Sequence, residues 1–230
     1  MKNWLRILIL FFAILFLQRA NVYAQAYQFS QFYAAPTFIN PAFAGTGVCS
    51  RLSTNYRLQW PSIPGAYKTY LLAYDRNLEK IKSGIGFIFA SDDAGSGNLR
   101  STSFAGQYSY HLTLSRVWTL DAGFQAGLTM RSYDFGKFIF GDQIAYGTGS
   151  SSALLPTLNP VHYPDISSGL LLYSADGWLG FSALDLNQPN QALIGEDVSR
   201  LPTLYSLHGG WVFPIMNRDD IGKNGQCQYT

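Results

Sequence analysis

The chain has 230 residues and a formal net charge of +2; 13% of its residues are charged and 16% are aromatic. The charged share is about half of that usual in soluble domains. The small net charge, without a basic cluster, gives no support for binding to nucleic acid. Cys49 and Cys227 are the two cysteines, far apart in the chain. We therefore do not expect a disulfide, although an exported protein could form one if the ends met.

The N-terminus has the pattern of an export signal. Lys2 and Arg6 precede an uncharged apolar run over residues 7–17, and residues 22–24 form a small-residue cleavage site. This run is too short for a membrane-spanning helix, which needs about 20 residues. We therefore expect residues 1–24 to be a cleaved signal peptide rather than an uncleaved anchor.

Residues 25–50 form a lead-in segment rich in aromatic residues and proline. Pro36 and Pro41 exclude a continuous helix or an interior strand, so we expect an extended, partly looped segment. Its aromatic content indicates a plug that folds into or under a barrel lumen, or a docking segment for a periplasmic partner. Simple packing against the first strands would explain the same residues. The candidate contact residues are Phe29, Ser30, Gln31, Phe32, Tyr33, Asn40, Pro41, Phe43 and Gly45.

An alternation of polar and apolar residues then predicts strands, because strand side chains point to opposite faces with a period of two. In residues 51–60, every odd-numbered position is polar, whereas Leu52, Tyr56 and Leu58 are among the even-numbered ones. Further alternating stretches predict strands over residues 67–76, 84–90, 103–112, 120–131, 166–173, 178–184 and 203–213. Eight strands are thus expected within residues 51–216.

The segments between these strands contain turn-forming residues. Residues 91–98 predict a loop, and residues 176–177, an Asp-Gly pair, predict a tight turn. Residues 135–164 contain three prolines and predict a long loop, of the kind that outer-membrane barrels place outside the cell. Residues 217–230 are turn-like with no closing strand. We expect a truncated piece of a longer barrel; closure by eight strands with a ragged tail is the alternative.

The predicted fold class is all-β: an antiparallel transmembrane β-barrel of the outer-membrane type, incomplete at its C-terminus. A soluble β-sandwich would show the same alternation, but the low charge content and glycine-rich polar faces favour the barrel. Aromatic residues near strand ends would then form a girdle at the membrane interface. These residues are Trp60, Tyr70, Tyr74, Trp118, Trp178 and Trp211.

No residue pattern indicates catalysis, a cofactor or a metal. Residues 92–98 lack the ligand spacing and the terminal glutamate of a calcium loop. His111, His162 and His208 fall on separate predicted elements, without Cys or carboxylate neighbours at metal-ligand spacing. A Gly-x-Ser-x-Gly nucleophile motif is absent. We predict a protein that is not an enzyme and that holds no cofactor.

Several segments resemble the type IX secretion system membrane proteins of the PorP/SprF family. The resemblance rests on two motifs taken together, FSQFYAAP at residues 29–36 and NPAFAG at residues 40–45. Supporting segments are residues 56–65, 84–87, 93–95 and 108–110. It covers about residues 28–213 and implies an outer-membrane barrel of a Gram-negative bacterium. In the secretion and gliding machinery, such a barrel would scaffold or anchor exported cargo at the cell surface.

The partners that this resemblance implies are outer-membrane lipid, periplasmic and lipoprotein components of the machinery, and secreted cargo with C-terminal secretion signals. Relatives usually run longer, in agreement with the expected truncation. An alternative function remains open. Residues 40–42 (Asn-Pro-Ala) followed by Gly45 are also similar to the lead-in of long-chain fatty-acid transporters. The alternative is an outer-membrane channel or hydrophobic-solute transporter.

Overall fold

The computed structural model describes residues 29, 31–62, 65–95, 99–133, 144, 160–192 and 199–212. Its eight strands form one antiparallel sheet, in which each strand pairs with the next one along the chain. They are β1 (Arg51–Gln59), β2 (Tyr67–Leu78), β3 (Ser83–Ala94), β4 (Leu99–Thr113), β5 (Thr119–Ser132), β6 (Val161–Tyr173), β7 (Gly177–Leu184) and β8 (Leu204–Trp211). All eight predicted strands are confirmed.

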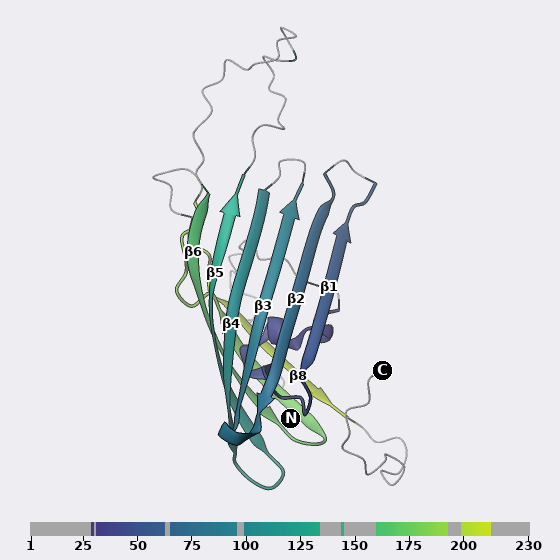
Figure 1. Cartoon of the computed structure of the whole chain (residues 1–230), viewed down its shortest axis with the longest axis vertical. Helices are drawn as coiled ribbons and strands as arrows, with labels where there is room; N and C mark the ends of the chain where they lie inside the picture. Colours follow the sequence, from purple (N-terminus) through teal and green to yellow (C-terminus); the bar gives the residue numbers. More distant parts are fainter. Residues whose placement is uncertain are drawn as a thin grey trace, which may run out of the picture.

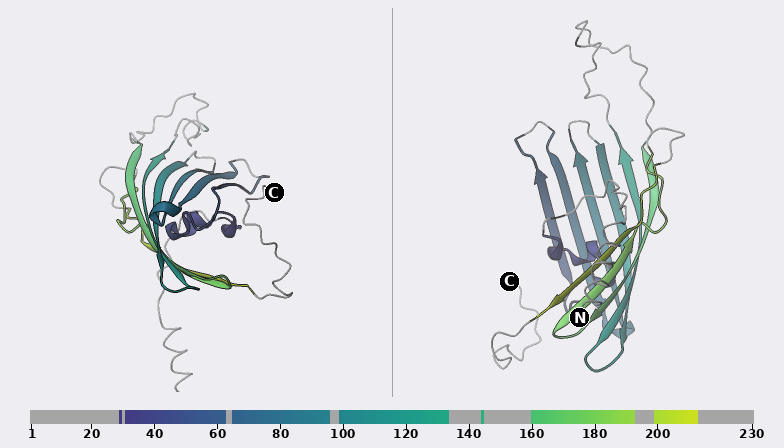
Figure 2. Two further views of the ribbon diagram at one scale, coloured as in Figure 1. Left: turned by 60° about the horizontal axis from the view of Figure 1, so that its bottom comes forward. Right: turned by 180° about the vertical axis from the view of Figure 1, so that it is seen from behind.

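The sheet is strongly curled, so that it forms an open half-barrel (Figures 1 and 2). β1 and β8 lie at the two edges of the described sheet and are not paired with each other. Residues 79–82, 114–118 and 174–176 make the short connections at one end, which we call the turn end. The opposite end, where β5 leaves and β6 begins, is the loop end. The predicted all-β antiparallel architecture is confirmed, and the described strands make an open half-barrel.

The two faces of the sheet differ as the alternation predicts. Along β1, Arg51, Asn55 and Arg57 are half-buried on the concave face, while Leu52 and Tyr56 are exposed on the convex face. The same alternation continues through β2 to β8. The concave face is therefore the more polar one, and the bulky apolar residues point outward.

Two predicted loop boundaries were wrong. β3 continues to Ala94, into the predicted loop at residues 91–98, because its pairing with β4 extends that far. Asp93 lies opposite Arg100, and Arg100 Nε is 2.7 Å from Asp93 Oδ1. This cross-strand ion pair supports a strand that local turn propensity disfavours. The end of β3 is therefore set by its pairing with β4 rather than by the turn-forming residues in its sequence.

β6 begins at Val161, so the loop predicted over residues 135–164 ends earlier, and Pro164 lies inside a strand. β7 pairs only with residues 168–173 of β6, which leaves one side of β6 free of a neighbouring strand at Pro164. Asn187 Nδ2 donates to Pro164 O on that side, at 2.6 Å. In a β-strand, the backbone N and O of one residue point to the same side. Pro164 O points away from β5, so the N of Pro164 points away from β5 as well, and its missing N–H removes no hydrogen bond to β5.

Cys49 is disulfide-bonded, contrary to the sequence-based expectation. The other cysteine of the chain, Cys227, lies outside the described residues. The large separation of the two cysteines along the chain was therefore a poor guide to whether Cys49 is bonded.

Candidate functional site

The lead-in segment lies on the concave side of the half-barrel (Figure 2). It contains three short helical turns, η1 (Phe32–Ala34), α2 (Pro36–Ile39) and η2 (Pro41–Phe43). Proline suits the first position of a helical turn, where its missing N–H breaks no bond. Asn40 caps η2, because its Oδ1 accepts a hydrogen bond from Ala42 N at 2.9 Å. We call residues Asn40–Gly45, which carry the NPAFAG motif, the strap.

The first residue of the strap is anchored to the last three strands. The Asn40 side chain is fully buried, and its Nδ2 lies 3.1 Å from Leu170 O of β6 and 3.2 Å from Phe181 O of β7. The same atom is 3.2 Å from His208 Nε2 of β8. A single amide thus joins three neighbouring strands through their backbone and one imidazole.

Glycines on the concave face make room for the strap. A Cβ added at Gly169 would overlap Asn40 Oδ1, and one added at Gly123 would overlap the backbone N of Ala42. At Gly84, an added Cβ would overlap the backbone O of Ala44. These glycines belong to β6, β5 and β3, so the strap approaches the backbone of the sheet across its width.

The other end of the strap is bound to the first four strands. Ser109 Oγ of β4 donates to the backbone O of Ala44. Gly45 N donates to Asp75 Oδ2 of β2 at 3.0 Å, and Gly45 has a left-handed φ of 73°. Asp75 also binds Arg51 of β1, with Nε 2.8 Å from Oδ1. Together with Gly84 of β3 and the contacts to β5–β8, the strap reaches every strand of the described sheet.

Phe43 places an aromatic ring between the strap and the last two strands. Its centroid is 5.3 Å from that of Trp178 in an edge-on arrangement and 5.8 Å from the stacked ring of His208. Trp178 therefore lies on the concave face, and its assignment to a membrane girdle was wrong. The girdle assignment considered only its position near a strand end, whereas the alternation of β7 places Trp178 on the same face as the buried Gly180 and Ser182.

The structure separates the predicted contact residues into two groups. Asn40, Pro41 and Gly45 are buried in the strap and Phe43 is half-buried there. Gln31 and Tyr33 are exposed, with 68% of Tyr33 accessible, and Phe32 begins η1. Phe29 is half-buried and packs edge-on against Phe38, at a centroid distance of 5.5 Å. Ser30 lies outside the described residues.

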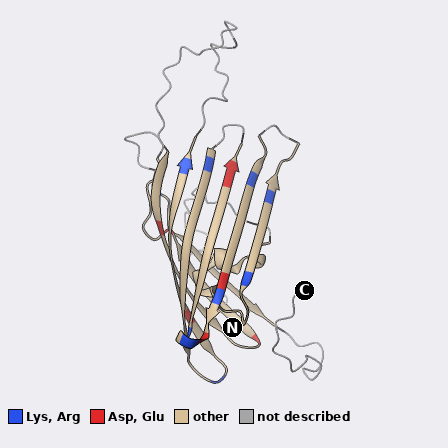
Figure 3. Ribbon diagram, viewed as in Figure 1, with Lys and Arg blue, Asp and Glu red and all other residues tan. Residues whose placement is uncertain are grey.

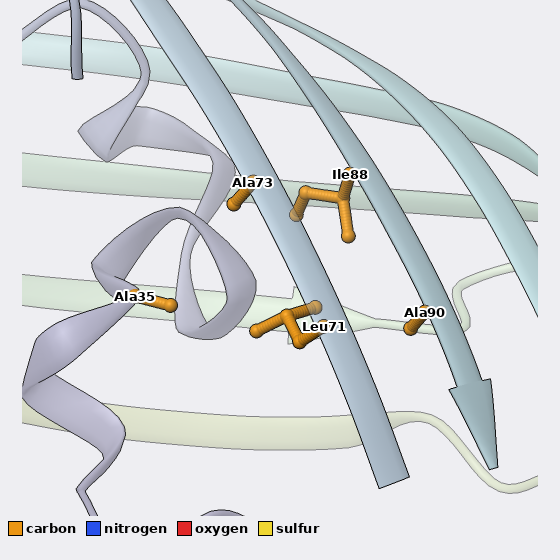
Figure 4. Close-up of a cluster of buried hydrophobic side chains, with 5 residues drawn as sticks. All are labelled: Ala35, Leu71, Ala73, Ile88 and Ala90. Carbon is orange, nitrogen blue, oxygen red and sulfur yellow. The ribbon is translucent and has the colours of Figure 1, made fainter. Parts of the chain in front are cut away.

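An apolar cluster holds the segment before the strap in place. Ala35 of the lead-in packs with Leu71 and Ala73 of β2 and with Ile88 and Ala90 of β3 (Figure 4). Phe29 and Phe38 pack against this cluster. On β4, Gln107 Nε2 donates to Thr37 O at 2.8 Å and to Gln125 Oε1 at 2.7 Å. The lead-in is thus held by both apolar packing and buried hydrogen bonds.

A cavity of about 360 Å³ lies beside the lead-in, toward the loop end. Its lining includes Phe38, Arg131, Tyr163, Asp165 and Asp185. Asp185 follows the last residue of β7, and burial together with the nearby carboxylate of Asp165 raises the pKa of Asp185 to about 7. The cavity therefore contains a carboxyl group that changes charge near neutral pH.

Several side chains at the strap were not singled out in the sequence. Asp75, Gly123 and Gly169 belong to no motif, because each is one polar or small residue within an alternating strand. Gly84 and Ser109 lie in segments that support the family resemblance, but the sequence did not assign them a contact with the strap. His111 has a carboxylate partner after all: its Nδ1 is 2.8 Å from Oδ2 of Asp121, which is fully buried. Strand register brings the two residues face to face across β4 and β5.

Within the described ranges, no group of three or more His, Cys, Asp or Glu side chains is placed to hold a metal ion. In the same ranges, no helix has the length and apolar character needed to cross a membrane.

The meander topology, the curled sheet and the concave face crossed by the N-terminal segment define an all-β protein of half-barrel type. The chain belongs to the PorP/SprF family of type IX secretion system membrane proteins, whose family model matches residues 21–226. The resemblance seen in the sequence is therefore confirmed. Comparison with curated proteins and with solved structures finds no match. Family membership makes the chain a membrane component of the secretion system, in a family not known to be enzymatic.

Proposed function

We propose that the chain forms the wall of an outer-membrane β-barrel, with lipid covering the convex face of the sheet. The supporting observation is a belt of outward residues without charge. On β2, the outward residues between Lys68 and Arg76 are Tyr70, Leu72 and Tyr74. At about 3.4 Å per residue, this interval spans about 27 Å along the strand. The apolar band of outer-membrane barrels is about 25 Å tall.

The belt continues around the described sheet. It includes the exposed residues Leu52, Tyr56, Phe87, Phe89, Phe104, Tyr108, Phe124, Leu128, Ile166, Leu170, Leu179, Phe181, Tyr205 and Leu207. A patch of this extent would promote aggregation in water, whereas hydrocarbon chains cover it favourably. Because bare strand edges are costly in lipid, the proposal includes pairing partners for the free edges of β1 and β8.

Within this barrel, we assign the chain a role as scaffold or surface anchor for exported cargo of the secretion and gliding machinery. It reaches the outer membrane after cleavage of its signal peptide and acts with periplasmic and lipoprotein components. The strap supports this role over the alternative of a solute channel, because buried hydrogen bonds hold it across the concave face. Liposome swelling tests the alternative, and solute-dependent swelling would favour a channel or transporter.

The lead-in has two parts in this proposal. The strap acts as a plug, and Gln31 and Tyr33, whose side chains are exposed, form part of the surface that a periplasmic partner contacts. Deleting the whole lead-in would also remove the strap, so point variants are the sharper test. Gln31→Ala with Tyr33→Ala should reduce partner recovery in a pull-down while leaving heat-modifiable gel migration unchanged. Unchanged partner recovery would reject the docking role.

The lipid-covered face can be tested with probes on opposite faces of the sheet. In a background with both cysteines replaced by serine, Leu72→Cys carries a fluorescent label on the convex face, and Asn55→Cys carries it on the concave face. In vesicles with nitroxide-labelled lipid chains, the label at position 72 should be quenched more strongly than the label at position 55. Equal quenching, or a compact monomer without detergent, would overturn the proposal.

The anchoring role needs its own test, because a barrel could insert without binding cargo. Cells that produce a tagged chain are treated with a surface cross-linker, and the outer-membrane fraction is purified. We expect secreted proteins with C-terminal secretion signals to co-purify, and to be lost when the signal is deleted from the cargo. Recovery that is independent of the signal would contradict anchoring.

A further inference from the structure

We infer that the turn end of the half-barrel binds the phosphate groups of anionic phospholipids. The binding surface consists of four cationic side chains, Arg76, Lys80, Lys82 and Arg116, which we call the basic rim. All four are exposed. Arg76 lies near the end of β2, Lys80 and Lys82 lie in or next to η3 (Glu79–Ile81), and Arg116 lies in the turn between β4 and β5 (Figure 3). The inference rests on the proposed lipid contact of the convex face.

The charges of the basic rim are available for a ligand. The described residues contain the ion pairs Arg51–Asp75 and Arg100–Asp93 and the contact between His111 and Asp121, and none of these includes a cation of the rim. On the three turns, the cations are Lys80, Lys82 and Arg116 and the acidic residues are Glu79 and Asp176; Arg76 at the end of β2 adds a fourth cation. The surface therefore carries an excess of positive charge.

The basic rim adjoins the apolar belt directly. Arg76 has the same outward orientation on β2 as Tyr74, two residues earlier. Ile81, Leu114 and Val117 lie beside the cations on the turns and are 57%, 55% and 60% exposed. Cations beside exposed apolar residues suit the boundary between hydrocarbon and headgroups, where long side chains bury their stems and direct their charges to phosphate.

The loop end differs from the turn end in its outward charges. Among the described residues there, Arg100 is neutralised by Asp93, and Lys68 and Arg200 are further exposed cations. A lipid ligand is favoured over an acidic protein because Arg76 points sideways from the wall, toward the position of neighbouring lipid, rather than along the axis of the half-barrel.

Lipid retention provides the test. The full chain is reconstituted in vesicles of phosphatidylcholine mixed with phosphatidylglycerol, and the lipids that stay bound after gentle detergent extraction are counted by native mass spectrometry. We expect phosphatidylglycerol to be enriched several-fold, since one cation near an anionic surface raises binding by about fivefold. The triple variant Lys80→Gln, Lys82→Gln, Arg116→Gln should lose most of this enrichment. Lys68→Gln, at the loop end, should keep it.

The outcomes separate this inference from the proposed function. If position 72 is quenched by lipid but the triple variant retains the full enrichment, or the unchanged chain shows none, the basic rim does not bind lipid. If position 72 is not quenched, the lipid-covered face itself is rejected. A triple variant with normal lipid enrichment that no longer recovers periplasmic components would reassign the rim to an acidic protein partner and overturn the inference.

Discussion

Asn40 Nδ2 lies 3.2 Å from Nε2 of His208, although the two residues are 168 positions apart in the sequence. The contact joins the first residue of the strap to the last strand of the described sheet. Because the same amide binds Leu170 O and Phe181 O, the strap and three strands share one buried hydrogen-bonding centre. The stability of the half-barrel should therefore depend on residues outside its strands.

Asn40→Ala should destabilise the folded chain by about 2 kcal/mol or more, because it removes several buried hydrogen bonds and the cap of η2. The urea midpoint of unfolding in detergent micelles measures the effect. Asn187→Ala is the matched control: its amide also binds backbone groups but is exposed, so water can replace it. Equal shifts for the two variants would show that burial of Asn40 contributes nothing.

Gly123→Ala should destabilise the chain by about 1–3 kcal/mol, because the new methyl group would overlap the backbone of Pro41 and Ala42. Gly106→Ala is its control, since a Cβ at Gly106 meets no atom within 4 Å. Gly106→Ala should be neutral or slightly stabilising, because alanine restricts the unfolded chain. Thermal unfolding of both variants in the same detergent tests the difference, and a harmless Gly123→Ala would mean that the strap does not pack against β5.

Asp75→Ala should destabilise the chain by about 3 kcal/mol, because it leaves Arg51 without its ion-pair partner and Gly45 N without its acceptor. Asp75→Asn should have a smaller effect, because the amide oxygen can still accept from Gly45 N. Chemical unfolding of both variants provides the comparison. The expected order would be contradicted if Asp75→Asn were as damaging as Asp75→Ala.

The raised pKa of Asp185 predicts that stability depends on pH around neutrality. The folded-state pKa of about 7 lies above the unfolded value of about 3.9, so the folded chain binds the proton more tightly. Stability should therefore increase as the pH falls from 8 through 7, and this contribution should level off below about pH 4. Asp185→Asn should be more stabilising at pH 8 than at pH 5. Unfolding midpoints measured across this range test the sign, and an equal effect at both values would contradict it.

The strands could be predicted from the sequence because their signal is local. In β1, the alternation that begins with polar Arg51 and apolar Leu52 already indicates that Arg51 points to the concave face and Leu52 to the convex face. The start of β6 was missed, because Pro164 reads as a loop residue until its unpaired side is known. Local patterns thus identify strands better than they identify strand ends.

The site was predicted only in part, because its contacts are not local. The motif drew attention to Asn40 and Gly45, yet the sequence does not show that they bind residues 168 and 30 positions away. Trp178 was assigned to a membrane girdle because it lies near a strand end, although the alternation of β7 places it on the concave face, and its ring partner Phe43 is far away in the sequence. Such partners become visible only when the strand register is known.

The spread of the strap contacts has a consequence for the order of folding. Each strand pairs with its neighbour in the chain, so hairpins can form from nearby residues. The set of groups that binds the strap is complete only after the last hairpin has formed, because these groups come from strands β1 to β8. The NPAFAG motif is synthesised early, because it lies near the N-terminus. Its binding to the sheet should nevertheless be a late folding step, which stabilises the sheet after all eight strands have paired.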